Sequence, residues 1–93
     1  MELPQNYDEI SRNERRLVRE EYVRLQKGKC YFCKSDLSEQ PPEHIINKRI
    51  NKRLFPEGFF NYPIHLHHDH DSGKTIGAVH AYCNAVLWQY YGQ

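Results

Sequence analysis

The sequence predicts a small α+β domain, in which an N-terminal helix precedes a β-hairpin that leads into a second helix. Three observations predict this class: a helical apolar repeat early in the chain, two alternating apolar segments around a turn at residues 71–74, and an apolar helical run at residues 83–91. With 93 residues the chain has the length of about one domain. We therefore expect residues 1–93 to form a single domain, with residues 1–9 as a flexible leader.

The first element is a helix expected from about residue 10 to residue 26. Its apolar stripe consists of Ile10, Leu17, Val18, Tyr22 and Leu25. Ser11 or Asp8 can cap its start, and Lys27-Gly28 is a typical stop. The other faces carry arginines and acidic residues in balance, so we expect an ion-paired, solvated surface.

The middle of the chain, residues 38–63, contains several prolines and is expected to be irregular. Within it, a basic run without any acid comprises Lys48, Arg49, Lys52 and Arg53. An exposed polar loop and a contact to nucleic-acid phosphates both fit this run.

The hairpin is expected from a first strand at residues 64–69 and a return strand at residues 75–80. Asp71-Ser72-Gly73-Lys74 between them has the composition of a turn. The helix that follows ends at Gly92 and carries Trp88, Tyr90 and Tyr91, which we expect to pack in the core rather than form a contact surface.

A zinc site is predicted from two pairs of ligands at matching spacing. Cys30 and Cys33 form a C-x2-C pair, and His80 and Cys83 repeat the spacing as H-x2-C. Disulfides explain three cysteines poorly, because one is left over and the N-terminus does not resemble a secretory signal. Zinc takes four nitrogen or sulfur ligands in a tetrahedron, and such a site would staple a small core. His44 is an alternative fourth ligand, and simple burial of the thiols is an alternative to metal binding.

A second cluster lies within six residues: His65, His67, His68, Asp69 and His70. A neutral imidazole is a suitable general base near pH 7, and a neighbouring His or Asp can hold a divalent cation against a phosphate. Asn84, next to Cys83, could complete the shell of that cation. Strand alternation sends His67 and His68 to opposite faces, so both serve one site only if the strand ends or bulges there. A solvated loop would also accommodate these histidines.

The stretch from His65 to Gly77, followed by His80-x2-Cys83-Asn84, resembles the ββα-metal (His-Me finger, HNH) nuclease motif. It is most similar to the recombination endonuclease VII branch. The upstream helix and the turn that carries Cys30 and Cys33, called here the first knuckle, also match that branch. The similarity covers roughly residues 17–37 and 64–92. The resemblance implies a ββα-metal fold and a metal-dependent DNA endonuclease that hydrolyses backbone phosphodiesters and nicks or cuts double-stranded DNA.

The resemblance also implies a role for individual residues. His68 falls on the general base that activates water, and His70 falls on an auxiliary active-site histidine. His67 and Asn84 fall on the ligands of one catalytic Mg²⁺ or Mn²⁺ ion. No histidine follows Asn84, and Leu87 stands where some relatives have an acid. The expected shell of the ion is therefore His67, Asn84, water and substrate. The structural zinc ligands are Cys30, Cys33, His80 and Cys83.

The expected partner is DNA, whose phosphates would be held by Lys48, Arg49, Lys52 and Arg53. We expect a monomer or homodimer, and no apolar stretch is long enough to span a bilayer. The expected location is the cytoplasm of a bacterial or phage-infected cell. One alternative is a catalytically inactive, zinc-stapled DNA-binding module. Another is a protein-interaction zinc finger that uses the aromatic residues of the last helix.

Overall fold

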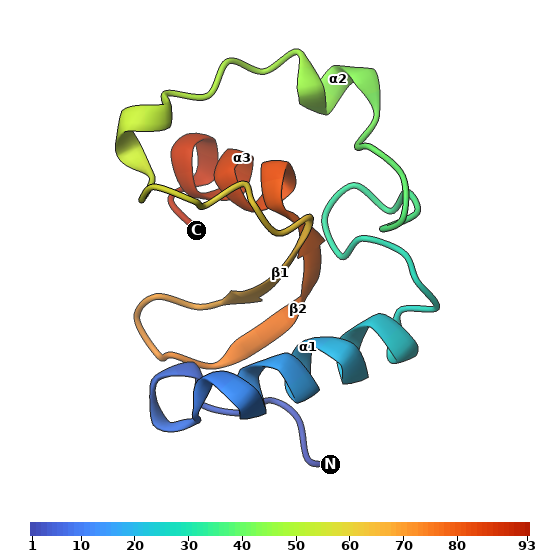
Figure 1. Ribbon diagram of the computed structural model, residues 1–93, viewed down its shortest axis with the longest axis vertical. Coiled ribbons are helices and arrows are strands. Elements are labelled where there is room, and N and C mark those ends of the chain that lie inside the picture. Colours follow the sequence, from blue (N-terminus) through green and yellow to red (C-terminus); the bar gives the residue numbers. More distant parts are fainter.

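The computed structural model describes all residues, 1–93, and confirms the small α+β class. Its elements are the 3-10 helix η1 (Tyr7–Glu9), α1 (Arg12–Leu25), α2 (Glu43–Ile46), the 3-10 helix η2 (Lys52–Leu54), β1 (Ile64–His68), β2 (Thr75–His80) and α3 (Ala81–Tyr91). The two strands form one antiparallel hairpin. Helices α1 and α3 both contact this hairpin, which lies between them, and residues 38–63 pass around α3 (Figure 1).

Helix α1 begins after Ser11, one of the two caps that the sequence offered. The Ser11 hydroxyl accepts a hydrogen bond from the Glu14 backbone N–H at 3.1 Å, and the Glu14 carboxylate accepts one from the Ser11 N–H at 3.0 Å. The predicted apolar stripe is only partly correct. Val18 is buried, whereas Leu17 and Leu25 are 42% and 53% exposed, because a two-stranded hairpin is too narrow to cover the whole stripe.

The N-terminal segment pairs with the hairpin, although we expected residues 1–9 to be a flexible leader. The Thr75 N–H donates to the Gln5 carbonyl at 2.9 Å, and the Tyr7 N–H donates to the Gly73 carbonyl at 2.7 Å. Gly73 has φ +77°, and a Cβ there would lie 2.8 Å from Asn6 Oδ1. A glycine is therefore required in this turn both by its backbone conformation and by the segment packed against it.

The outer edge of β2 is covered by other parts of the chain. The Gln26 amide exchanges hydrogen bonds with the backbone N–H and carbonyl of Ala78, at 2.8 and 2.9 Å. The Tyr31 N–H donates to the same carbonyl at 2.9 Å. These contacts satisfy backbone groups that an edge strand would expose. The residues of β1, in contrast, line an open cavity.

Helix α3 starts at Ala81, directly after β2 and two residues earlier than the run expected from residue 83. It buries Cys83, Val86 and Leu87 in a core whose members are Cys30, Leu37, Ile45, Ala78, Val79, Cys83, Val86 and Leu87. The expectation that its aromatic residues pack in the core is wrong: Trp88, Tyr90 and Tyr91 are 42%, 46% and 55% exposed. The smaller residues of α3 already fill the space against β2. None of the helices combines the length and the apolar character needed to cross a lipid bilayer.

A candidate metal centre beside a histidine-lined cavity

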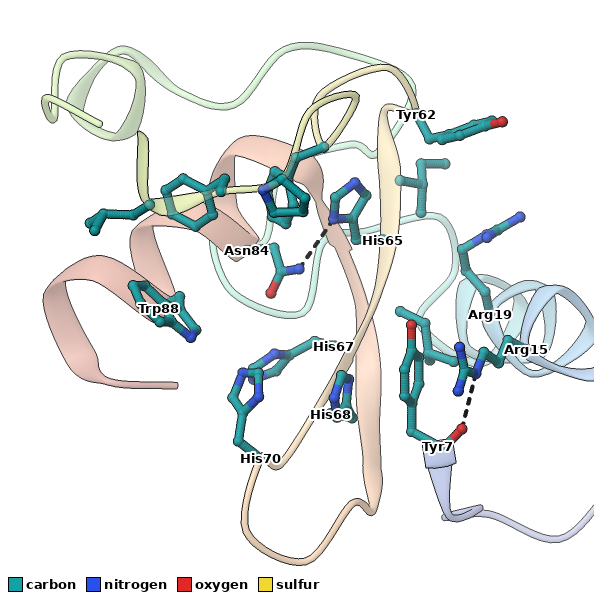
Figure 2. A pocket seen from close by; sticks show the side chains of 16 residues that line it. Tyr7, Arg15, Arg19, Tyr62, His65, His67, His68, His70, Asn84 and Trp88 are labelled. Atoms are coloured by element: carbon teal, nitrogen blue, oxygen red, sulfur yellow. Dashed lines mark hydrogen bonds between the residues drawn. The ribbon is translucent and has the colours of Figure 1, made fainter. Parts of the chain in front are cut away.

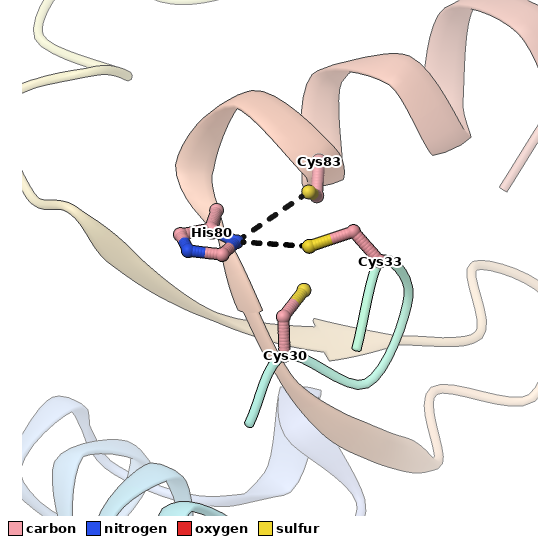
Figure 3. A group of neighbouring side chains, drawn as sticks. All are labelled: Cys30, Cys33, His80 and Cys83. Atoms are coloured by element: carbon pink, nitrogen blue, oxygen red, sulfur yellow. Dashed lines mark hydrogen bonds between the residues drawn. The ribbon is translucent and has the colours of Figure 1, made fainter. Parts of the chain in front are cut away.

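Four side chains gather where the first knuckle meets the start of α3: Cys30, Cys33, His80 and Cys83 (Figure 3). Their donor atoms all lie within 4.8 Å of one another, close enough to hold a metal ion. His80 Nδ1 lies 3.5 Å from Cys33 Sγ and 3.6 Å from Cys83 Sγ. A tetrahedral zinc ion with ordinary bond lengths places its sulfur and nitrogen ligands about 3.5 Å apart. The geometry is therefore compatible with zinc.

The His80 ring is fixed in the tautomer that such a site requires. Its Nε2 lies 2.9 Å from the Asp36 carbonyl oxygen and 2.8 Å from the Glu39 carbonyl oxygen. Because carbonyl oxygens only accept hydrogen bonds, Nε2 carries the proton. Nδ1 is then the bare nitrogen, and it faces the sulfur atoms. Metal-binding histidines are commonly oriented in this way by a second hydrogen bond.

The thiols are also prepared for binding a metal. The neighbouring Cys83 thiol lowers the pKa of Cys30, and the pKa of Cys83 is raised in turn. Cys30 therefore loses its proton more readily than an ordinary thiol, and the thiolate is the form that binds metals. His44, the alternative fourth ligand, is exposed on α2 and is not part of the group.

A cavity of about 500 Å³ lies beside this centre (Figure 2). Its lining comprises Tyr7, Arg15, Arg19, Leu54, Phe55, Pro56, Phe59, Tyr62, Ile64, His65, Leu66, His67, His68, His70, Asn84 and Trp88. The hairpin register is irregular between His67 and His68, which face Gly77 and Thr75 across the sheet. This bulge lies where the sequence required one for both histidines to reach a single site.

Asn84 connects α3 to the histidines of β1. Its Nδ2 lies 3.1 Å from His65 Nδ1, so the amide donates and this ring nitrogen accepts. Asn84 and His67 also line the same cavity, and the Asn84 side chain acts to raise the pKa of His67. The amide oxygen of Asn84 points away from His65 and into the cavity (Figure 2). The His67 imidazole and the Asn84 amide oxygen thus both belong to the wall of this cavity.

His68 lies in a stack with two residues from the N-terminal part of the chain. The Tyr7 ring is parallel to the His68 ring, within 5° and with centroids 3.8 Å apart. On its other face, the Arg15 guanidinium lies 3.8 Å from the Tyr7 centroid, while Arg15 Nε donates to the Tyr7 carbonyl at 2.9 Å. The His70 ring lies 5.0 Å from the His68 ring. This stacking fixes the orientation of the His68 imidazole ring.

The environment keeps the strand histidines neutral. Burial lowers the pKa of His65, His67 and His68, and the neighbouring imidazoles lower the pKa of His67 and His68 further. At pH 7 these rings are therefore available as bases or metal ligands.

The structure brings His67, His68, His70 and Asn84 to the same cavity. Asp69, considered in the sequence as a cation ligand, is directed elsewhere. Its carboxylate accepts hydrogen bonds from the backbone N–H groups of Asp71 and Ser72, at 2.8 and 2.9 Å, and these bonds lower its pKa.

The four residues predicted to bind DNA phosphates do not line the cavity. These residues are Lys48, Arg49, Lys52 and Arg53. Their segment is fixed to α3 instead. The Arg49 carbonyl accepts hydrogen bonds from Gln89 Nε2 at 2.9 Å and from the Tyr90 hydroxyl at 2.7 Å. The basic run therefore lies beside the cavity and not inside it.

Sequence reasoning missed Tyr7, Arg15, Arg19 and, as a partner of Asn84, His65. Neither Arg15 nor Arg19 forms a salt bridge, although we expected the charges of this helix to be ion-paired. Their spacing of four residues, next to buried Val18, is the signal that places both on the hairpin side of α1. For Tyr7 the sequence offers no signal.

Comparisons with protein-family models, with curated proteins and with solved structures found no match. The arrangement itself links the two clusters, because Cys83 and Asn84 are adjacent at the start of α3. A metal ion at the four-ligand group would fix this helix end against the knuckle, and thereby fix Asn84 against β1.

Proposed function

We propose that this chain is a metal-dependent DNA endonuclease with a ββα-metal fold, which hydrolyses backbone phosphodiesters. The observation that carries the proposal is that His67, His68 and Asn84 line one cavity. The cysteine–histidine group, whose geometry is compatible with zinc, includes Cys83, the residue next to Asn84. A neutral imidazole, a nitrogen ligand and an amide oxygen are the groups that water activation and cation binding at a phosphate require.

In the proposed reaction, His68 takes a proton from a water molecule, and the resulting hydroxide attacks the phosphorus. The bond to the 3′ oxygen breaks, and this oxygen takes a proton from solvent water while His68 later returns its proton to solvent, which leaves 3′-hydroxyl and 5′-phosphate ends. A Mg²⁺ or Mn²⁺ ion held by His67 and the Asn84 amide oxygen would supply positive charge at the phosphate and the leaving oxygen. The lowered pKa of His68 keeps its ring unprotonated and able to accept the proton.

The four-ligand group is, in this proposal, a structural zinc site, because four protein ligands leave no open coordination position. The DNA backbone is held by cations on both sides of the histidines. Arg15 and Arg19 line the cavity from α1, and the basic run of Lys48, Arg49, Lys52 and Arg53 lies on the α3 side.

Nicking of supercoiled plasmid tests the proposal. The zinc-loaded chain is incubated with Mg²⁺, Mn²⁺, Ca²⁺ or no added divalent ion, without a chelator. We expect nicking with Mg²⁺ or Mn²⁺ and none without them. Asn84→Ala removes one of two protein ligands and is expected to slow nicking about 100-fold. If no ion supports nicking while DNA still binds, the chain is an inactive DNA-binding module instead.

The stack on His68 gives a second prediction, in which Tyr7 is a positioning residue. Tyr7→Ala removes the ring that holds the imidazole plane and is expected to lower the nicking rate about 2- to 10-fold, the value of one aromatic contact. Tyr7→Phe keeps the ring and is expected to retain the wild-type rate. Single-turnover rates measured at saturating enzyme check this, and equal losses in both variants would contradict a role through stacking.

A further inference from the structure

The cavity has two chemically different parts. His67, His68, His70 and Asn84 form the polar part, and Leu54, Phe55, Phe59 and Trp88 form an apolar wall. Both belong to one continuous cavity, so a ligand whose charged group lies at the histidines extends over the aromatic rings. Figure 2 shows Trp88 on α3 below Asn84, with its indole on the same side of the helix as the histidines.

The rings of the apolar wall pack against one another, but Trp88 stays partly exposed. The Phe55 ring lies 5.7 Å from the Trp88 ring and 4.8 Å from the Phe59 ring, and Phe59 packs edge-on against His65 at 4.6 Å. These contacts hold the rings in place. Trp88 nevertheless remains 42% exposed, so its surface is available to a planar ligand.

Asn84 and Trp88 are one helical turn apart on α3, so their side chains are neighbours on one face. This places a flat aromatic surface next to the point proposed for the scissile phosphate. Arg15 and Arg19, neither of which forms a salt bridge, line the same cavity, and their positive charge complements a phosphate backbone. A phosphate followed by a planar, apolar-faced ring is the chemistry of a nucleotide.

We propose, building on the nuclease function, that the apolar wall stacks an unpaired nucleobase next to the cleaved phosphate. A base inside a duplex is already stacked on its neighbours and reaches such a wall only after extrusion, which is least costly where it is unpaired. The preferred substrate is therefore DNA with a single-stranded or unpaired nucleotide at the cleavage position. Stacking on an aromatic side chain tolerates any base, so this selects for strand structure and not for sequence.

Trp88 is the only tryptophan in the chain, and its fluorescence reports directly on the wall. The zinc-loaded protein, without Mg²⁺, is titrated with a single-stranded oligonucleotide, the same strand with abasic positions, and the blunt duplex. We expect quenching by the single strand and little change with the abasic strand or the duplex. Equal responses to all three would overturn the proposal.

Binding of a labelled single strand to variants provides the second measurement. Trp88→Ala is expected to weaken binding about 5- to 150-fold, whereas Trp88→Phe, which keeps an aromatic face, binds nearly as wild type. Tyr91→Ala is the matched control, since Tyr91 is an exposed aromatic of α3 outside the cavity. Zinc content and circular dichroism verify folding. Unchanged binding by Trp88→Ala would overturn the proposal.

Failure of this inference is distinguishable from failure of the nuclease function. Plasmid nicking without preference for unpaired substrates would leave the endonuclease standing and remove the base site. Base-dependent quenching of Trp88 without any nicking would keep the base site on a chain that binds nucleic acid without cutting it.

Discussion

Loss of metal from the cysteine–histidine group is expected to unfold the protein. Cys30 and Cys83 are fully buried members of the core, and His80 is 4% exposed. Zinc contributes about 10–16 kcal/mol in zinc-finger peptides, which is comparable to or larger than the whole stability of a typical domain, about 5–15 kcal/mol. Cys30→Ser and His80→Ala are therefore expected to lose zinc and the cooperative thermal transition, measured by metal analysis and circular dichroism.

His44→Ala is the matched control, because His44 is an exposed histidine outside the group. It is expected to retain one zinc per chain and the wild-type melting temperature. A chelator added to wild-type protein should reproduce the effect of Cys30→Ser, and restored zinc should reverse it. A Cys30→Ser chain that contains no zinc and melts as wild type would show that the four residues are only core residues.

The spacing of the ligands made the metal centre predictable from the sequence. The tautomer of His80, in contrast, could be assigned only from the folded structure. A C-x2-C or H-x2-C pair is local, so its geometry follows from one turn of backbone. The carbonyl oxygens of Asp36 and Glu39, which orient the His80 ring, lie more than 40 residues away in the chain. No local sequence pattern predicts a contact between residues so far apart in the chain.

The surroundings of the histidines were predicted least well, for the same reason. The hairpin follows from local alternation and turn chemistry, so the sequence predicted it. The bulge was only one of two conditions, beside an end of the strand, under which His67 and His68 could serve one site. The stack of Arg15 and Tyr7 on His68 and the aromatic wall around Trp88 depend on how α1 and residues 38–63 pack against the hairpin. We expected Trp88 in the core, because an apolar helix end gives no sign of which residues the short hairpin can cover.

His68→Ala is expected to lower plasmid nicking by about 10²- to 10⁴-fold, the usual contribution of a general base. His68 is half-buried, neutral and held by Tyr7, so its removal takes away the proton acceptor without touching the zinc ligands. Zinc content, the thermal transition and DNA affinity are expected to stay near the wild-type values. The rate is measured as the first-order loss of supercoiled plasmid in Mg²⁺ or Mn²⁺.

The matched control is His70→Ala, because His70 lies 5.0 Å from His68 in the same cavity but is exposed and outside the stack. A smaller loss in His70→Ala than in His68→Ala assigns the proton transfer to the stacked ring. If the two variants lose activity in the reverse order, His70 is the base, and the Tyr7 stack serves only the fold. If His68→Ala nicks as fast as wild type, water is activated by another group, and the proposed mechanism is wrong even though the cation site persists.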